Sequence, residues 1–315
     1  MKLIDDILRL TPGEGEAISE WYINKLAYLI DRGIYPKRAT LGNIVEKIVA
    51  GLKDYRIQHG IENIVVGQSG GVDSALTAAL FKQAGWITHG VTMPIHQNEE
   101  ETNRGIENID ALRLERHHFD LTEQFDSMQD FLGEFGNTYK GQQRQGNIRA
   151  RLRMITLYNL AHKLNGCVAS TDNFSELAAG FWTLHGDVGD VAPIQSLSKS
   201  WEVPALADML GVPENTITAL PTDGLGISNS DADQLGMNYL EFDILLFELL
   251  SLPEMYEDDL RKYINSIEDD EIRDKAWLVA NRVKGTAYKR ANPFNLVHPV
   301  FSDRFAILDK LDRSL

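Results

Sequence analysis

The sequence predicts an α/β fold with a doubly wound parallel sheet, flanked by helical regions at both ends. Between residues 61 and 235, short apolar runs alternate with amphipathic segments, which is the βαβ rhythm of a parallel sheet. Residues 1–60 and 236–315 instead carry apolar residues at three- and four-residue spacing, as amphipathic helices do. We find no internal repeat and no low-complexity tract. We therefore expect a single domain over 1–315, with a helical N-terminal flank, a sheet-bearing core and a helical C-terminal region.

The expected elements follow one another in a simple order. The N-terminal flank holds three helices, at about 4–10, 17–33 and 40–60. The core alternates strands at 62–67, 87–95, 117–121 and 166–171 with helices at 73–85, 99–114 and about 145–165. The C-terminal region returns to helices at 239–252, 258–267 and 271–285, and the tail 291–315 stays unassigned. Because ligands of such sheets bind at the carboxyl ends of the strands, the loops after the strands are where a site is expected.

Composition excludes several classes of protein. The 315 residues include 43% apolar residues, 25 Gly and 10 Pro, which describes an ordinary folded chain and excludes disorder and collagen. There are 31 Lys and Arg against 46 Asp and Glu, so the net charge of −15 would repel a phosphate backbone, and we expect no nucleic-acid partner. The single cysteine, Cys167, excludes an intrachain disulfide and a Cys-based zinc cluster, and its apolar neighbours favour a buried strand residue in a reducing compartment.

No segment of the sequence predicts a membrane span or an export signal. The most apolar stretch, 242–252, is interrupted by Asp243 and Glu248 and is far below the ~20 apolar residues that a span needs. The start, MKLIDDILRL, carries acids where a signal peptide has an apolar core. We expect a cytoplasmic protein with no membrane partner.

The most informative segment is a glycine-rich loop between the first predicted strand and the helix that follows it. Its residues are Gly67, Gln68, Ser69, Gly70, Gly71, Val72, Asp73 and Ser74. A strand that runs through glycines directly into a helix brings free backbone N–H groups and a helix N-terminus together, which makes an anion site. The loop lacks the lysine of the GxxxxGK[ST] motif, and Asp73 beside a phosphate implies a bridging Mg²⁺. The alternative is a glycine turn in which Asp73 or Ser74 caps the helix.

Two family resemblances rest on this loop and on later motifs. The string SGGVDS at 69–74 resembles the pyrophosphate-binding signature of the N-type ATP pyrophosphatases, which activate a carboxylate or carbonyl as an adenylate and release pyrophosphate. This resemblance implies bound ATP and an adenine nucleotide alpha hydrolase-like fold. Residues 147–199 are similar to the NAD synthetase family, with a weaker echo in VKGTAYKR at 283–290. An RxRM helix, a TD-x-x-x-E segment, a GDGG-x-D loop and an L-x-K step are all recognisable in the family's order.

Three polar residues follow the strand predicted at 166–171, namely Thr171, Asp172 and Glu176. They lie at the carboxyl end of a strand, on the same sheet edge as the glycine loop, so geometry permits one shared site. Mg²⁺ commonly takes one or two carboxylates plus substrate phosphates, and the resemblance implies that Asp73 and Glu176 are its ligands, with Thr171 in the ATP site. Alternatively, Asp172 and Glu176 merely cap and solvate the start of a helix.

The resemblance also implies contacts to both nucleotides. Lys199 matches a family lysine at the ATP phosphates, and Thr222 matches an ATP-contacting threonine. Arg151 matches a contact to the dinucleotide. Because Arg151 and Arg153 are two residues apart on a helix, we expect only one of them to reach a ligand. The structural alternatives are a solvated lysine, a turn residue and a surface salt bridge.

The loop HGDVGDVAP at 185–193 is where the resemblance places the nicotinate end of the substrate. It assigns Asp187 to the reaction site and Asp190 to substrate binding, and a polar surface turn is the alternative. The loop is one residue shorter than the family pattern, and Leu184 stands where the family usually has a substrate-binding lysine.

At the far end of the similarity, Tyr288 and Lys289 replace the family's His-Lys pair and are expected to bind deamido-NAD. The sequence thus departs most from the family pattern at the residues that the resemblance assigns to dinucleotide binding.

The activity implied by the resemblance is that of an ammonia-dependent NAD synthetase. Mg²⁺-ATP adenylates the nicotinate carboxylate of deamido-NAD, and ammonia then displaces AMP, with Asp73, Lys199 and Asp187 at the reacting groups. Glutamine-using relatives carry an added amidase domain with a catalytic cysteine, for which the flanks are too short here, so ammonia is the expected nitrogen source. Family members are homodimers, and the N-terminal helices are candidate interface elements.

Two alternatives from other classes remain. A tRNA-modifying pyrophosphatase would share SGGVDS, but it would want catalytic cysteines and a basic face, against one Cys and a charge of −15 here. A nucleotide-binding module without catalysis would keep the loop but have no use for Glu176, Lys199 and Asp187 together.

Overall fold

A computed structural model of the chain describes residues 2–11, 18–133, 138–222, 230–252 and 257–291. Its centre is a four-stranded sheet in the order β3-β2-β1-β4, in which every neighbouring pair is parallel. The strands are β1 (Asn63–Gly67), β2 (Ile87–Thr92), β3 (Glu115–His118) and β4 (Cys167–Val168). Each overlaps the range expected for it, and the predicted parallel sheet is confirmed.

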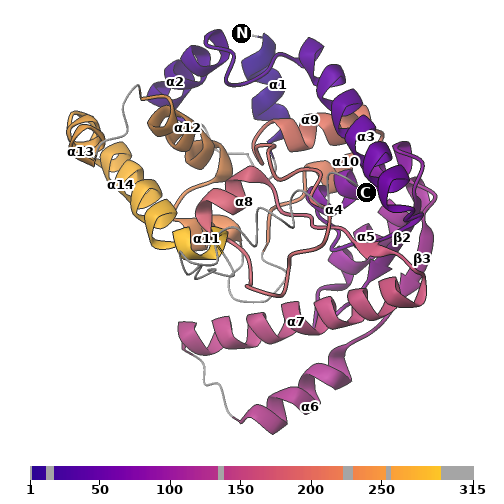
Figure 1. Cartoon of the computed structure of the whole chain (residues 1–315). Helices are drawn as coiled ribbons and strands as arrows, with labels where there is room; N and C mark the ends of the chain where they lie inside the picture. Colours follow the sequence, from indigo (N-terminus) through magenta and orange to yellow (C-terminus); the bar gives the residue numbers. More distant parts are fainter. Residues whose placement is uncertain (1, 12–17, 134–137, 223–229, 253–256, 292–315) are drawn as a thin grey trace, which may run out of the picture.

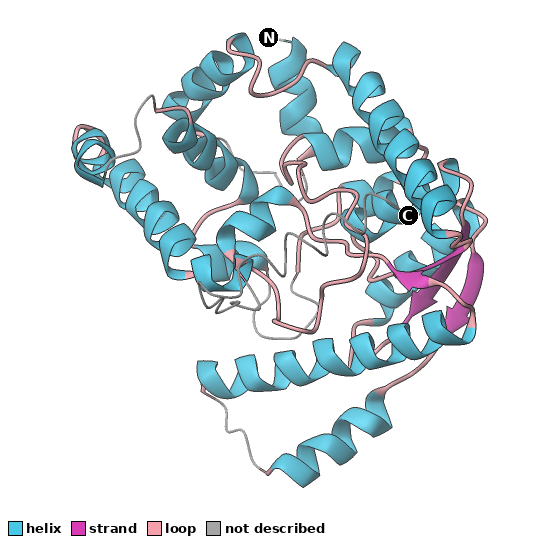
Figure 2. Ribbon diagram, viewed as in Figure 1, coloured by secondary structure: helices cyan, strands magenta, loops and turns pink. Residues whose placement is uncertain are grey.

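Helices cover both faces of this sheet (Figure 2). The connecting helices are α4 (Val72–Gln83), α5 (Glu99–Ala111), α6 (Thr122–Leu132) and α7 (Tyr139–Lys163). Successive side chains of a strand point to opposite faces, so Ile64 and Val66 of β1 enter the core that contains α4. Val65 enters a second core, with Phe125 of α6 and Leu160 of α7. The sheet is therefore doubly wound, as expected.

The two helical flanks complete the larger core. They comprise α1 (Lys2–Leu10), α2 (Glu20–Asp31), α3 (Arg38–His59), α12 (Tyr239–Leu250), α13 (Glu257–Asn265), α14 (Asp270–Gly285) and α15 (Ala287–Arg290). Leu26 of α2, Leu41 of α3 and Phe242 of α12 are buried in one cluster with Ile64. Figure 1 shows α1, α2, α9 and α12 gathered at the top of the view and α6 and α7 at the bottom. The helical prediction for both flanks is confirmed.

Between β4 and α12 lie four short helices that the sequence pattern does not reveal, because each is too short to show a period. They are α8 (Phe174–Ala179), α9 (Glu202–Met209), α10 (Glu214–Ile217) and α11 (Asp231–Leu235). β4 is shorter than the expected 166–171 because beyond Val168 the chain pairs with Val191. Ala169 forms a parallel bridge with Val191, and the Ser170 N–H donates to the Val191 carbonyl at 2.9 Å.

The start of α7, the C-terminal tail and the absence of a predicted membrane span were the remaining expectations about the fold. α7 begins earlier than the expected 145, since the Thr138 side chain caps it by accepting from the Gly141 N–H at 3.2 Å. Beyond Ala291, the unassigned tail lies outside the described residues. Within the described ranges, no helix has both the length and the apolar character needed to cross a bilayer.

Candidate active site

The glycine-rich loop joins the carboxyl end of β1 to the N-terminus of α4, as expected. Gly70 has a φ of +89°, and a Cβ built on it would lie 2.2 Å from the carbonyl oxygen of Glu101, so only glycine fits there. Gly71 is the N-cap of α4, with no side-chain cap, so the alternative that Asp73 or Ser74 caps this helix is wrong. The Ser74 hydroxyl instead donates to the Gly71 carbonyl at 2.9 Å. The Gly71 N–H donates to Ser69 Oγ at 3.3 Å, and the first turn of α4 offers backbone N–H groups to an anion.

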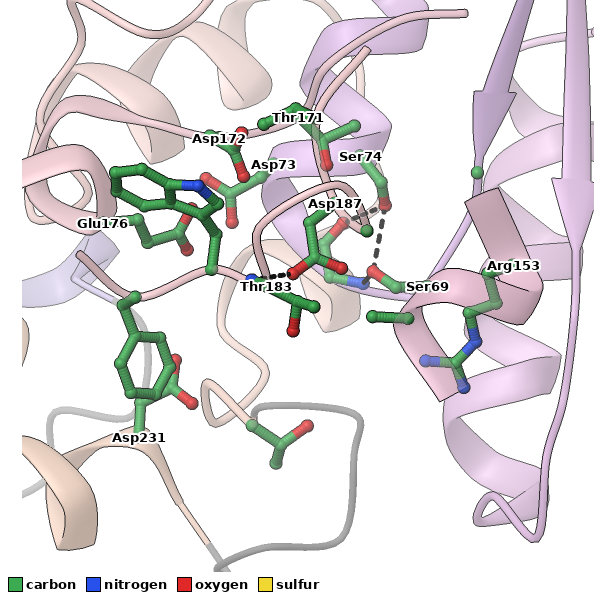
Figure 3. A pocket seen from close by; sticks show the side chains of 18 of the residues that line it. Ser69, Asp73, Ser74, Arg153, Thr171, Asp172, Glu176, Thr183, Asp187 and Asp231 are labelled. Carbon is green, nitrogen blue, oxygen red and sulfur yellow. Dashed lines mark hydrogen bonds between the residues drawn. The ribbon is translucent and has the colours of Figure 1, made fainter. Parts of the chain in front are cut away.

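A cavity of about 580 Å³ opens over this loop. Its size suits a nucleotide-sized ligand. It is lined by all eight loop residues 67–74 and by nearly every other residue that the sequence singled out, namely Thr171, Glu176, Lys199, Thr222, Arg151, Asp187, Tyr288 and Lys289. Figure 3 shows that Asp73, Glu176, Asp172 and Asp187 all turn toward one space beside Ser69 and Ser74. The fold therefore brings these residues to one shared cavity.

The most concentrated charges in the cavity are those of Asp73, Glu176 and Lys199. The Lys199 ammonium forms a salt bridge with Asp73 Oδ2 and lies 3.5 Å from Glu176 Oε1. Asn173 donates from Nδ2 to Asp73 Oδ1 at 2.8 Å. Lys199 is therefore neither solvated nor on the surface. All three charged side chains are fixed at the end of the cavity that the phosphate loop forms.

The pKa values of these groups follow from their burial and mutual charges. Burial and the neighbouring Asp73 raise the pKa of Glu176 well above its usual value, against the opposing effect of Lys199. Burial lowers the pKa of Lys199, but Asp73 and Glu176 outweigh it, so the net shift is upward and the ammonium stays charged. Two carboxyl groups thus share one cation, and a second bound cation would favour the ionised form of Glu176.

The helix-capping alternative for Glu176 is also borne out, alongside its place in the cavity. Glu176 and Asn173 form a reciprocal capping box at the start of α8, in which Glu176 Oε2 accepts from the Asn173 N–H at 3.2 Å. Because the capping contact uses Oε2, the carboxylate is oriented with Oε1 toward Lys199.

Asp172 and Asp187 form a second acidic pair in the cavity. The Asp187 carboxylate accepts from the Thr183 N–H at 2.7 Å, and burial raises its pKa. Asp172 accepts from the Ser170 hydroxyl at 2.9 Å, and burial, together with the charges of Asp187 and Asp73, raises the pKa of Asp172 to about 7. A carboxyl group that titrates near neutrality inside a cavity is typical of a functional site.

The structure does not bring Asp190 to the cavity. One of its oxygens accepts from the Val168 N–H at 2.8 Å and the other from the Tyr158 hydroxyl at 2.9 Å. These contacts tie the residue to the end of β4 and to α7, and it is absent from the cavity wall. The role expected for Asp190 in binding substrate therefore has no support in the geometry.

Both arginines of the RxRM helix line the cavity, and the expectation that only one of them reaches a ligand stays a prediction. Arg151 donates from Nη2 to the Leu184 carbonyl at 3.1 Å, and Arg153 donates from Nε to the Met93 carbonyl at 3.1 Å. The two side chains reach the cavity from different sides of α7 because one bonds the 184 loop and the other bonds the segment after β2. Arg153 also lies close enough to Asp187 to lower its pKa.

Lys289 and Tyr288 form the wall of the cavity contributed by α15. The Lys289 ammonium donates to the carbonyls of Gly180 at 2.6 Å and Trp182 at 2.5 Å, and lies 5.3 Å from the centre of the Trp182 ring. Burial and the charge of Arg282 lower the pKa of Lys289. Tyr288 is largely exposed at the rim.

Among the residues that line or support the site and that the sequence did not single out are Asp231, Glu101 and Asn173. Asp231, at the start of α11, lines the cavity and accepts from the Tyr239 hydroxyl at 3.1 Å. Glu101 accepts from the Thr222 hydroxyl at 2.9 Å, and Asn173 orients Asp73. The serine and aspartate of SDAD at 230–233, a helix-start pattern, were the available signal for Asp231.

Comparison with known proteins agrees with this geometry. The family model described as NAD synthase matches residues 44–293 of this chain. The chain belongs to the NAD synthase family. It is 34% identical over 218 residues to an NH(3)-dependent NAD(+) synthetase of Alkaliphilus oremlandii, a match that covers 67% of this chain and 86% of that relative.

Two solved structures extend the likeness to the fold. The NH3-dependent NAD synthetase from Campylobacter jejuni has a TM-score of 0.63 at 27% identity, covering 82% of this chain and 99% of that one. A structure titled NMN synthetase, from Francisella tularensis, has a TM-score of 0.66 at 25% identity, covering 82% and 98%. The resemblance inferred from the motifs at 69–74 and 147–199 is confirmed, and family membership makes the chain an ATP-dependent, amide-forming ligase.

Proposed function

We propose that this chain is an ammonia-dependent NAD synthetase. It adenylates the nicotinate carboxylate of deamido-NAD with release of pyrophosphate, and ammonia then attacks the adenylate and displaces AMP. The observation that carries the proposal is that the phosphate loop, the Lys199 cluster and the Asp172–Asp187 pair line a single cavity. A phosphate site alone would suit many nucleotide-binding proteins. A phosphate site beside cations and carboxylates from three other loops suits a reaction between two nucleotides.

Adenylation addresses the chemical obstacle to amide formation. A carboxylate is a poor electrophile, whereas an acyl adenylate has AMP as a leaving group. In the proposed arrangement the N–H groups of residues 69–74 bind the ATP phosphates, and Lys199 offsets the charge that develops on the departing pyrophosphate. No side chain need become a covalent nucleophile, so the work of the protein is alignment and electrostatics.

The residues present fit a Mg²⁺ ion at Asp73 and Glu176. Their four oxygens are hard donors, and with both groups ionised the pair carries one more negative charge than Lys199 offsets. Burial and the charge of Asp73 raise the pKa of Glu176 well above its usual value, and a bound cation would oppose that rise. Among the described residues no group of three or more His, Cys, Asp or Glu could hold a metal, so substrate phosphates would complete the shell. When bound, Mg²⁺ supplies charge neutralisation at the phosphates.

Ammonia must reach the adenylate before water does. Asp187 lies in the 185–193 loop with its carboxylate held by the Thr183 N–H, and Trp182 and Lys289 cover the loop beside it. This wall limits water at the reacting carbon in the proposed complex. The Asp172 carboxyl, with its pKa near 7, is placed to exchange protons with an incoming ammonium.

Free ammonia is proposed as the nitrogen source because this chain offers no amidase nucleophile. Burial, with Asp190 nearby, raises the pKa of the Cys167 thiol to about 11, so it is not a thiolate at neutral pH.

We also propose that the chain forms a homodimer through α6 and α7 and folds as the single domain expected. Large apolar side chains of these helices are exposed, namely Phe131, Leu132, Tyr139, Ile155 and Tyr158. The N-terminal helices bury most of their apolar side chains in their own core and expose fewer large ones, Tyr28 and Ile57.

The test uses radiolabelled ATP with deamido-NAD and ammonium. The proposal requires equal amounts of AMP, pyrophosphate and NAD. Formation of ADP would indicate a kinase or ATPase, and no turnover would indicate a binding module or a different acceptor such as tRNA. Because one similar structure is titled NMN synthetase, nicotinate mononucleotide is tested as an alternative acceptor. A higher kcat/KM with the mononucleotide would replace deamido-NAD in the proposal.

A further inference from the structure

The catalytic cavity depends on a turn that has no regular secondary structure. Lys199 lies between β4 and α9, in residues 198–201, where neither a helix nor a strand supplies hydrogen bonds. Lys199 and Ser200 are nevertheless almost fully buried, so their backbone N–H groups need partners. The position of the Lys199 ammonium beside Asp73 thus depends on whatever holds this turn.

Three consecutive N–H groups of the turn are held by side chains from three different helices. The Ser198 N–H donates to Glu202 Oε2 of α9 at 2.9 Å. The Lys199 N–H donates to Ser175 Oγ of α8 at 2.9 Å, and the Ser200 N–H donates to Asp243 Oδ2 of α12 at 3.0 Å. The first partner is local, whereas the last comes from the C-terminal helical region.

Asp243 is completely buried beside this turn. Its carboxylate accepts from the Ser200 N–H, and it lies near the hydroxyls of Ser175 and Ser200, both of which lower its pKa. Asp243 therefore holds Ser200 directly and lies beside Ser175, the residue that accepts from the Lys199 N–H. Burial raises the pKa of Asp243 to about 6, and the two serines and Lys199 oppose that rise.

Opposite Asp243, the N-terminal flank holds the same residue. The Thr11 hydroxyl donates to the Ser200 carbonyl at 2.9 Å, and the Tyr35 and Ser200 hydroxyls lie 3.2 Å apart. Both helical flanks thus contact Ser200, the residue after Lys199. In the view of Figure 1, α8 is drawn between α9 and α12.

We infer that Asp243 is a positioning residue for the reaction: it fixes the turn that holds the Lys199 ammonium between Asp73 and Glu176. The inference rests on the proposed function of Lys199. It gives the C-terminal helical region a role in the chemistry that neither the motifs nor the family resemblance assigns.

Removing the carboxylate leaves the buried Ser200 N–H without its acceptor, and the turn must move to satisfy it. A displacement of about 1 Å at a reacting group costs on the order of 100-fold in rate. Asp243→Ala should therefore lower kcat for AMP formation by about 100-fold and leave the KM for ammonium unchanged. Asp243→Asn keeps an acceptor oxygen at the Oδ2 position and should restore most of the activity.

The decisive measurement is a double-mutant cycle with Lys199→Ala, made in the full-length protein. If Asp243 acts through Lys199, adding Asp243→Ala to Lys199→Ala should change kcat by less than about twofold. A smaller folded fraction would multiply both backgrounds equally, so non-additivity separates positioning from loss of fold. If Asp243→Ala does not fold, Ser175→Ala provides the same cycle, because it removes the acceptor of the Lys199 N–H directly.

Glu248→Ala is the matched control. Glu248 is a buried carboxylate on the same helix, but its partners are Lys25 and Tyr263, remote from the turn. It should lower stability and leave kcat of the folded protein unchanged. Additive effects in the cycle, or a wild-type kcat in Asp243→Ala, would overturn the inference alone. A Lys199→Ala variant with wild-type kcat would instead overturn the proposed role of Lys199, and the inference with it.

Discussion

Replacing Gly70 with alanine should destabilise the protein by about 2–5 kcal/mol, because the phosphate loop has no room for a methyl group there. Its φ of +89° costs an L-residue about 1–2 kcal/mol. The new Cβ would also lie 2.2 Å from the Glu101 carbonyl oxygen. The clash is with backbone at the start of α5, so relief requires a shift of a helix or of the loop, typically about 1–3 kcal/mol. The sum is a large part of the 5–15 kcal/mol that holds an ordinary domain folded.

The adjacent glycine provides the control. Gly71 has a negative φ of −93°, and the nearest atom to a Cβ there, Ser69 Oγ, would be 3.4 Å away. Gly71→Ala should therefore stay within about 0.5 kcal/mol of wild type. Urea unfolding followed by tryptophan fluorescence, without ATP, compares the two variants before any ligand contact enters. Equal unfolding free energies for the two alanine variants would refute this account of the loop.

Three other predictions concern the chemistry. Asp73→Asn and Glu176→Gln should each lower the rate of AMP formation by at least ~100-fold with unchanged circular dichroism, because each removes charge at constant volume; near-normal rates would remove that residue from the site. Glutamine should not replace ammonium as nitrogen donor, and Cys167→Ser should keep synthesis; NAD formed from glutamine in the parent and lost in the cysteine variant would contradict this. Leu184→Lys should lower the KM for deamido-NAD by about 10- to 100-fold and leave the KM for ATP unchanged, since an added charged hydrogen bond contributes ~1.5–3 kcal/mol. A change in the KM for ATP alone would place position 184 elsewhere.

The fold could be predicted because its determinants are local. β1 and β4 are short apolar runs bounded by polar or glycine residues, and the helices between the strands repeat apolar residues at helical spacing. The edge strand β3 is polar, with the sequence ERHH, and only its end overlaps the range expected from the sequence. The boundaries that shifted did so through single contacts between side chain and backbone. Thr138 starts α7 early, and Val191 takes over the pairing that ends β4 at Val168.

The phosphate end of the site could be predicted for a different reason. Parallel strands end at one edge of the sheet, so Asp73 after β1 and Glu176 after β4 could be expected at that edge, and the neighbouring positions of β1 and β4 bring them together. Such a prediction needs the order of the strands and helices and no side-chain detail. It applies to residues that directly follow a strand and does not extend to residues from other parts of the chain.

What could not be predicted depends on contacts between segments far apart in the chain. Asn173 orients Asp73 from 100 residues away, and Asp243 reaches back to the Ser200 amide across 43. No local pattern marks such a pair, because each member looks like an ordinary polar residue of a loop or helix. Asp190 shows the same effect of distant contacts. It lies in a loop one residue shorter than the family pattern, and its carboxylate accepts from the Val168 N–H and the Tyr158 hydroxyl instead of lining the cavity. A motif fixes which residue types are available, whereas the hydrogen-bond partners of each carboxylate decide which of them remain free to meet a substrate.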